Sequence, residues 1–173
     1  MAITKKSYGD FREHLNALEE RGKLVRIKRA INKDTELMPL VRWQFRGLEE
    51  RDRKAFLFEN VVDGKGKRYA MPVTVGTLAA TTEIYAIGLR CEPDEIHERW
   101  AQAQLKPLEP TLVTGAPVHE VVWQGQDLLN GHGLDMIPVP ISTPGFDNAP
   151  YLTSANWITK DIETGIYNIG NYR

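Results

Sequence analysis

Seven prolines fall between residues 106 and 150, at positions 107, 110, 117, 138, 140, 144 and 150. Proline lacks a backbone N–H and its ring clashes with the preceding helical turn, so long helices do not run through such a segment. Before Gln104 the sequence alternates helical and strand periods, and after it no convincing helical period returns. We therefore expect an α/β domain over residues 1–110 and a β-rich domain over residues 111–173.

The first domain is expected to alternate helices with strands. Asp10 is predicted to cap a helix that Gly22 ends, and a strand follows at residues 24–27. A second helix is expected from Asp34 to Gly47, with Pro39 in its first turn and Trp43 on its apolar surface. Strands 55–58 and 71–75 flank a glycine-rich hairpin loop, and helices follow at residues 79–89 and from Glu92, where Trp100 is expected to face inward. This alternation predicts an α/β layer domain.

The glycine-rich segment from Asp63 to Lys67 does not have the sequence of a phosphate-binding loop. It lacks the Gly-Lys-Ser/Thr ending, and no helical pattern follows it directly. A lone glycine, Gly76, joins a strand to a helix, where its role is usually geometric. We interpret both features as turns.

The second domain is predicted to be all β and incomplete. We expect a strand at 118–123, an edge strand or extended loop at 137–141, and a hairpin in which 151–159 pairs with 166–172 around 161–165. About sixty residues with three or four strands cannot close a barrel around its own core. The apparent strand edge at Arg173 should be paired or covered, so we expect a truncated chain or fragment of α+β class overall.

Charge and cysteine content exclude several classes of protein. The 22 basic and 23 acidic residues give a net charge of −1 and a pI near 6.4, which argues against a basic nucleic-acid-binding domain. No run approaches the roughly 18 apolar residues that span a bilayer, so no membrane partner is expected. The single cysteine, Cys91, cannot form an internal disulfide, and with no secretory signal it indicates a cytoplasmic protein.

Neither the histidines nor the tryptophans form a functional pattern. The histidines show no paired metal-ligand spacing, and the tryptophans are scattered, which favours packing over a base-stacking platform. The residues concerned are His14, His97, His119 and His132, and Trp43, Trp100, Trp123 and Trp157.

Several motifs resemble the UbiD-type decarboxylases, and the similarity covers the whole chain. Three lie near the C-terminus and four lie nearer the N-terminus, in the family's order. They are Asn148–Ala155, Thr159–Gly165 and Asn168–Arg173, and Asp10–Leu15, Gly22–Ile27, Phe56–Asn60 and Pro72–Val73.

This resemblance implies a longer enzyme with an N-terminal α/β domain, a central split β-barrel that binds FMN in its prenylated form, and a C-terminal domain for oligomerisation. By that comparison, this chain ends inside the barrel. The implied activity is that of a carboxy-lyase: reversible, non-oxidative decarboxylation of an aromatic or α,β-unsaturated carboxylic acid. The implied cofactors are prenylated FMN, a divalent metal (Mn or Mg) and a monovalent cation (K or Na). The prenylated flavin accepts the electrons left as carbon dioxide departs, while the protein orients the acid and excludes water.

The same resemblance implies the partners. They are the small-molecule acid, a flavin prenyltransferase that supplies the cofactor, and further copies of the enzyme in a dimer or hexamer when the chain is full length.

Two residues carry the implied chemistry. Arg173 matches the family's catalytic arginine, which also contacts the cofactor and the substrate, and its planar fork can hold a carboxylate through two hydrogen bonds. Asn168 matches the residue that binds the metal and the flavin phosphate. A neutral amide oxygen suits a hard divalent ion beside a phosphate, because it adds no negative charge.

The remaining site residues are implied by their positions in the same motifs. Ile169, Gly170 and Asn171 match backbone positions that line the flavin, where Gly170 would permit close approach of the main chain to the ligand. Thr153 falls on the substrate side of the pocket.

The spacing of Asn168 and Arg173 conflicts with a regular strand. Five residues is an odd offset, so ordinary alternation would direct the two side chains to opposite faces. We therefore predict a bulge or strand exit at Gly170–Asn171 that turns Arg173 into the same pocket. Ordinary alternation with both ends well ordered would contradict the shared site.

Two other functions remain open. The chain could be a non-catalytic binding or assembly subunit that completes its β-unit with a partner chain, or a small flavin-binding reductase, since split barrels also serve that chemistry. The family's downstream Gln-His pair, metal-ligating glutamate and Glu-containing acid/base motif have no counterpart here. We therefore expect this chain alone to be inactive.

Overall fold

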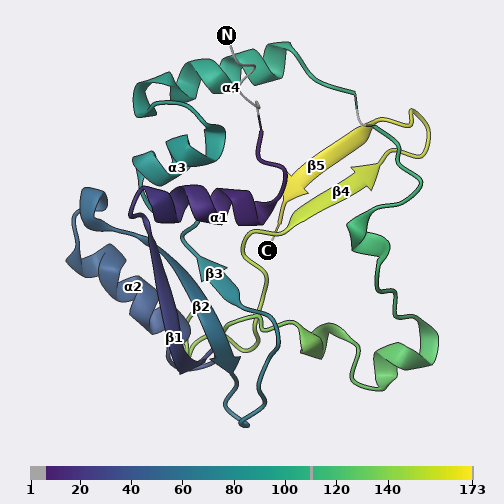
Figure 1. Ribbon diagram of the computed structural model, residues 1–173. Helices are drawn as coiled ribbons and strands as arrows, with labels where there is room; N and C mark the ends of the chain where they lie inside the picture. Colours follow the sequence, from purple (N-terminus) through teal and green to yellow (C-terminus); the bar gives the residue numbers. More distant parts are fainter. Residues whose placement is uncertain (1–6, 110, 173) are drawn as a thin grey trace.

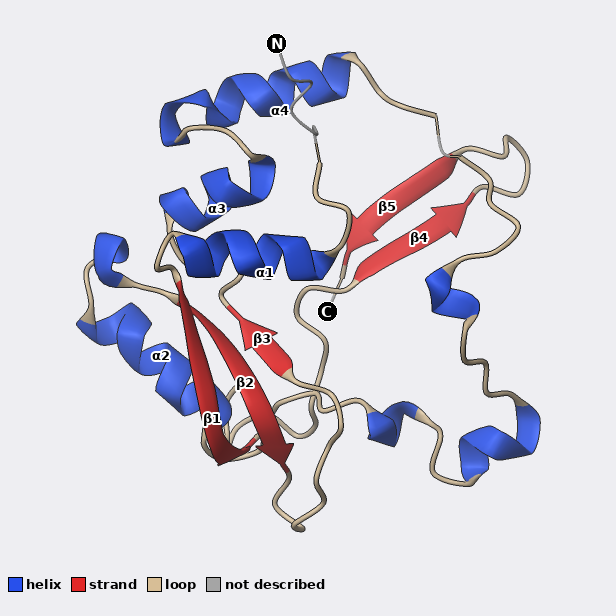
Figure 2. Cartoon of the chain, viewed as in Figure 1, coloured by secondary structure: helices blue, strands red, loops and turns tan. Residues whose placement is uncertain are grey.

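The computed structural model describes residues 7–109 and 111–172. A sheet with helices packed against it forms the N-terminal part, and a long segment of short turns then leads around the molecule to a β-hairpin (Figure 1, Figure 2). The helices are α1 (Phe11–Glu20), α2 (Leu37–Gly47), α3 (Thr82–Leu89) and α4 (Ile96–Leu105), and the strands are β1 (Leu24–Asn32), β2 (Ala55–Val62), β3 (Val73–Val75), β4 (Asn156–Lys160) and β5 (Tyr167–Asn171). No helix among the described residues is long and apolar enough to cross a membrane.

Three strands form a mixed sheet in the order β1-β2-β3. β1 and β2 are parallel, from Leu24 opposite Ala55 onward, and α2 connects them. β3 returns antiparallel to β2 after the glycine-rich loop, which confirms the predicted hairpin. The strands alternate with helices, so the mixed α/β class predicted for this part is confirmed.

The central strand β2 is buried because helices pack against it. One apolar cluster contains Leu18 of α1, Ala55 of β2 and Ile84 of α3. A second cluster packs residues of α2 against the sheet, where Phe58 and Val61 of β2 are almost completely buried. Burial along both faces is typical of a strand with a parallel neighbour and covering helices.

The predicted Asp10 cap of α1 is confirmed, whereas α3 begins at Thr82 and not at the predicted residue 79. The Asp10 side chain accepts a hydrogen bond from the Glu13 backbone N–H at 2.9 Å, as expected for α1. Thr81 caps α3 in the same way, through the backbone N–H of Ile84. Glu92 and Glu95 form a capping box before α4.

The predicted start of α2 at Asp34 is wrong. The Asn32 side chain accepts hydrogen bonds from the backbone N–H groups of Asp34 and Thr35, which holds these residues in a turn. Asn side chains compete with the helix in this way. The helix therefore begins at Leu37, and Pro39 lies in its first turn as predicted.

The proline-rich segment contains no α-helix and no strand among its described residues between Lys106 and Ala155. The strand predicted at residues 118–123 is wrong, because a 3-10 turn occupies Pro117–His119 and no described strand lies beside it to pair with. Residues 137–141 form the extended loop that was one of the two predicted forms. The Ile141 backbone N–H donates to the Lys33 carbonyl at 3.2 Å, so this loop is fastened to the end of β1.

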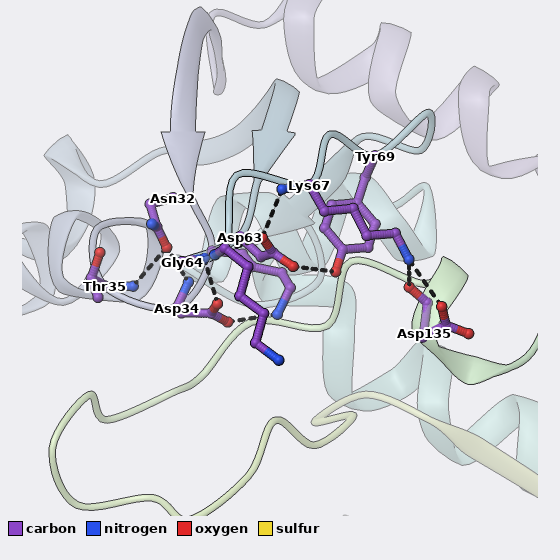
Figure 3. Close-up of polar contacts among 10 residues, drawn as sticks. Asn32, Asp34, Thr35, Asp63, Gly64, Lys67, Tyr69 and Asp135 are labelled. Atoms are coloured by element: carbon purple, nitrogen blue, oxygen red, sulfur yellow. Dashed lines mark hydrogen bonds and ion pairs between the residues drawn. The ribbon is translucent and has the colours of Figure 1, made fainter. Parts of the chain in front are cut away.

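Polar contacts at the glycine-rich loop also fasten the proline-rich segment to the sheet. Figure 3 shows the Asp63 carboxylate accepting hydrogen bonds from the Lys67 backbone and the Tyr69 hydroxyl. The Lys67 ammonium then reaches Asp135, whose carbonyl and carboxylate lie at 2.7 and 3.0 Å. A third contact comes from Arg42 of α2, which donates to the Ser142 carbonyl at 2.7 Å. Three separate contacts therefore hold residues 135–142 against the α/β part.

All four tryptophans are exposed by at least 39%. Trp43 on α2 is 76% exposed, and Trp157 on β4 is 54% exposed. Trp100, predicted to face inward, is also 47% exposed, although its indole N–H donates to the Tyr85 hydroxyl. The prediction that Trp43 and Trp100 carry apolar core surface is wrong, because both side chains are exposed to solvent.

Candidate functional site

The hairpin β4–β5 carries most of the site residues predicted from the sequence, and a four-residue loop, 162–165, closes it. The Asp161 backbone N–H donates to the Ile166 carbonyl at 2.9 Å, and the Gly165 N–H donates to the Asp161 carbonyl at 3.0 Å. Gly165 has φ of 71°, in the left-handed region that glycine adopts without strain. This pattern is a β-bulge at the turn, and it sets the register of the whole hairpin.

The register is regular beyond that bulge. Lys160 lies opposite Tyr167, and the pairing continues without a shift to Asn156 opposite Asn171. The bulge, one of the two forms predicted at Gly170–Asn171, is therefore absent. The other predicted form, a strand exit, agrees with the end of the strand at this point. β5 ends at Asn171, and Arg173 lies outside the described residues.

Ordinary alternation divides the predicted flavin residues between the two faces of the hairpin. Asn168 lies opposite Thr159, and Gly170 lies on the same face. Ile169 and Asn171 lie on the other face. The side chains of Asn168, Ile169 and Asn171 therefore cannot all contact one face of a planar ligand.

The backbone at the open edge of β5 offers a second kind of contact. Among the described residues, β5 pairs only with β4. The hydrogen bond between Asp161 and Ile166 fixes the alternation, so the backbone groups of Asn168 face β4 and those of Ile169 and Asn171 face the open edge. These N–H and C=O groups can bind the polar edge of a ring system.

A shallow pocket of about 440 Å³ surrounds Asn168 at the turn end of the hairpin. It is also lined by Thr159, Lys160, Asp161 and Thr164. Hydrogen bonds from the Thr164 backbone and hydroxyl lower the pKa of Asp161, so this carboxylate is held ionised. The pocket offers an amide, hydroxyls and one carboxylate, which are oxygen donors that a hard cation prefers, but its lining also includes the Lys160 ammonium, which repels a cation.

The donors around Asn168 do not complete a divalent metal site by themselves. Asp161 Oδ1 already accepts hydrogen bonds from Glu163 and Thr164. Across the described residues, no group of three His, Cys, Asp or Glu side chains could hold a metal ion. The described residues therefore assemble no such metal centre around Asn168.

Gly170 leaves space for a neighbouring aromatic ring. A Cβ atom at this position would overlap the ring of Tyr172. The Tyr172 carbonyl in turn accepts a hydrogen bond from the Trp157 indole N–H at 3.2 Å. A side chain at this position would therefore have to displace the exposed Tyr172 ring.

Thr153 lines a different cavity from Asn168. This cavity, of about 760 Å³, lies between β3 with the turn after it and the segments 137–142 and 151–155. The structure thus separates the residue predicted to face the substrate from the one predicted to bind the metal and phosphate.

Sequence reasoning missed His14 as a residue that positions the wall of this cavity. His14 on α1 is 5% exposed, and its Nε2 lies 2.8 Å from the carbonyl oxygen of Thr77, a residue of the cavity wall. The available signal was its place one turn before Leu18 on the buried face of α1.

Comparisons with known proteins identify the family that this chain resembles. A sequence model of the 3-octaprenyl-4-hydroxybenzoate carboxy-lyase N-terminal domain matches residues 15–104. The structure of the UbiD-class enzyme HmfF from Pelotomaculum thermopropionicum in complex with FMN has 31% identity and a TM-score of 0.73, over 92% of this chain and 33% of that chain. An evolved dimeric form of the same enzyme, in complex with prFMN, has 31% identity and a TM-score of 0.75, over 96% of this chain and 35% of that one.

The chain therefore spans about a third of the length of the solved chains it matches. The sequence model covers more than half of this chain, and the structural likeness extends across both the α/β part and the hairpin. The chain belongs to the UbiD family of carboxy-lyases, of which it represents the N-terminal part.

Proposed function

We propose that this chain forms part of an enzyme that decarboxylates an aromatic or α,β-unsaturated carboxylic acid reversibly, with prenylated FMN as cofactor. In this proposal residues 1–110 are the N-terminal α/β domain, and residues 111–173 begin the split β-barrel that binds the flavin. The observation that carries the proposal is the likeness to HmfF, a UbiD-class enzyme solved with FMN and with prFMN, over nearly the whole chain.

The hairpin supports the proposal through its geometry. The outward backbone groups of Ile169 and Asn171 fit the polar edge of a flavin, and Asn168 lies in a pocket with oxygen donors that suit a phosphate-bound cation. The prenylated flavin, when bound, supplies delocalisation of the electron pair left as carbon dioxide departs. We assign Arg173 to holding and orienting the carboxylate through its two-pronged guanidinium.

The metal forms a separate part of the proposal. Asn168 would supply one neutral ligand to a divalent ion, Mn or Mg, and the remaining ligands would come from outside the described residues. We propose no role for this chain's residues in binding the monovalent cation.

The proposed partners follow from the same reaction. They are the acid substrate, a flavin prenyltransferase that supplies the cofactor, and further copies of the full-length enzyme. We place the reaction in the cytoplasm, on the ground that Cys91 is the single cysteine.

A chimeric enzyme tests the proposal directly. This chain replaces the matching third of HmfF from Pelotomaculum thermopropionicum, and the chimera is produced together with a flavin prenyltransferase. Carbon dioxide release is then measured with a panel of conjugated acids. We expect release by the chimera, none by the 173-residue chain alone, and a loss of at least about a hundredfold with Arg173→Ala. Arg12→Ala, at an exposed position on α1, is the matched control.

Two further variants separate backbone contacts from side-chain contacts. Ile169→Val keeps the backbone groups at the open edge and should leave flavin binding unchanged. Ile169→Pro removes an N–H that faces away from β4, so the hairpin should persist while flavin binding weakens. Unchanged flavin binding by the proline variant, or full activity with Arg173→Ala, would overturn these assignments.

One observation favours the second candidate function, a non-catalytic assembly subunit. All five residues of β4 are exposed, and Ile158 on β4 and Ile169 on β5 are 69% and 68% exposed. A two-stranded sheet with apolar residues in solvent and open edges can accept a strand from another chain. Sedimentation of this chain with and without a full-length family member would detect such a complex.

A further inference from the structure

The cavity around Thr153 is built by two distant parts of the chain. One wall comes from β3 and the turn at residues 76–80, and the other comes from residues 137–142 and 151–155. Its volume of about 760 Å³ lies in the range of pockets that bind small molecules.

Hydrogen bonds from residues outside the lining hold both walls of the cavity in place. The Ile141 N–H donates to the Lys33 carbonyl, and Arg42 donates to the Ser142 carbonyl and to the Thr143 hydroxyl, at 2.7 and 2.9 Å. His14 holds the opposite wall through the Thr77 carbonyl. The cavity is therefore supported by bonds that do not depend on its contents.

The lining of this cavity is apolar and uncharged. None of the described residues that line it carries an ionised side chain, and its polar groups are limited to hydroxyls and backbone atoms. Several apolar side chains on its walls remain about half exposed, which leaves hydrophobic surface uncovered. They are Phe11 at 49%, Phe45 at 40%, Met71 at 42%, Leu78 at 53% and Leu152 at 47%.

Charged side chains near the cavity lie outside its lining: Arg42 donates to the Ser142 carbonyl at 2.7 Å, and others line an adjoining pocket. That pocket of about 420 Å³ shares Phe45, Ala79 and Ala80 with the cavity, and it holds Glu50 and Arg53. Moving a carboxylate into the uncharged cavity would therefore remove it from water without a cation to replace the lost hydration.

We propose that the cavity between β3 and residues 137–155 is a binding site for an uncharged apolar molecule of the size of a substituted benzene ring. The site excludes the free carboxylate form of the same ring. It is separate from the Asn168 pocket and stands whether or not the chain takes part in decarboxylation.

Methionine methyl resonances report on this site in the intact chain. Met38 and Met71 line the cavity, and Met136 does not. The 173-residue chain, labelled with ¹³C at its methionine methyl groups, is titrated with ethyl benzoate and separately with benzoate. We expect saturable shifts of the Met38 and Met71 methyls with the ester, a smaller change at Met136, and affinity for benzoate lower by at least about tenfold.

A charge placed in the wall supplies the second test. Leu152→Asp puts a carboxylate into the lining at a half-exposed position, and Ile162→Asp puts the same charge on the fully exposed hairpin turn. We expect the first variant to weaken ester binding about tenfold or more and the second to leave it unchanged.

Three outcomes would overturn the proposal. Equal affinity for ester and acid would show that the lining does not select against charge. Shifts that rise linearly without saturation would show that no site exists. Movement of the Met38 and Met71 signals with protein concentration alone, without ligand, would show that a second copy of the chain occupies the cavity. These binding measurements do not depend on decarboxylation by the chimera. Failure of the proposed function can therefore be distinguished from failure of the proposed binding site.

Discussion

Removing the Arg42 guanidinium should release the proline-rich segment from the α/β part. Arg42 on α2 donates to the Ser142 carbonyl and to the Thr143 hydroxyl, at 2.7 and 2.9 Å. Hydrogen bonds from charged groups contribute about 1.5–3 kcal/mol each. Because these two hydrogen bonds are only partly buried, water can replace part of their contribution in the variant. We therefore take a loss of about 2 kcal/mol for the two bonds together. Arg42→Met retains the apolar stem and isolates this loss.

The expected effect is local, and amide hydrogen exchange measures it. The Ile141 N–H is bonded to the Lys33 carbonyl, so it exchanges only when the segment opens. A loss of about 2 kcal/mol corresponds to an increase of about thirtyfold in the Ile141 exchange rate. Amides of β2 should change far less, because their exchange requires opening of the sheet.

A neighbouring arginine provides the control. Arg46 lies in the last turn of the same helix and is exposed, so Arg46→Met should leave Ile141 exchange unchanged. Arg42→Lys should fall between the two, because a single ammonium replaces the planar fork less completely. If Ile141 exchanges at the native rate in Arg42→Met, the segment is held by other contacts and the reasoning fails.

Three further perturbations test the core, a helix cap and the hairpin. Phe58→Ala empties a fully buried site and should lower the free energy of unfolding by about 3–5 kcal/mol in urea denaturation; a loss below 1 kcal/mol would contradict the proposed core. Hydrogen bonds from the hydroxyl and backbone N–H of Thr82 lower the pKa of the Glu50 carboxylate below 4.5. The contact between Glu50 and Thr82 therefore stabilises the fold above pH 4.5, and this stabilisation is lost as the pH falls through the lowered pKa. The difference in urea midpoint between the native chain and Glu50→Gln should therefore shrink on acidification, and a pH-independent difference would contradict this cap. Gly170→Ala should displace the Tyr172 ring, and unchanged ring resonances of Tyr172 would show that no overlap exists.

Local signals predicted the helices of the N-terminal part because each depends on a few adjacent residues. The Asp10 cap and the position of Pro39 in the first turn of α2 act over three or four residues, and both are present in the structure. The start of α2 was missed for the same physical reason. Asn32 uses its side chain to form a turn with Asp34, and this competes with the helix over an equally short range.

The strand predicted at residues 118–123 failed because a strand needs a partner as well as suitable residues. Val118, Val121 and Val122 favour extended backbone, yet each is more than half exposed. Among the described residues no strand runs beside them. The β-propensity of these valines therefore predicted a strand that does not form, because no neighbouring strand pairs with it.

The hairpin was predictable and its register was not. Alternating residues around Asp161 and Gly165 indicated two strands, which the structure confirms. The position of the bulge depends on which residue takes the left-handed conformation. Gly165 and Gly170 are both suitable by sequence, and the turn uses Gly165.

The position of that bulge decides what the candidate site can contact. With the bulge at Gly165, Asn168 directs its side chain to one face and its backbone toward β4, while Ile169 directs its side chain to the other face and its backbone outward. A bulge one residue further along β5 would exchange these roles. A ligand that contacts Asn168 through its side chain and Ile169 through its backbone must therefore lie across the open edge of β5, and neither face of the hairpin alone can hold it.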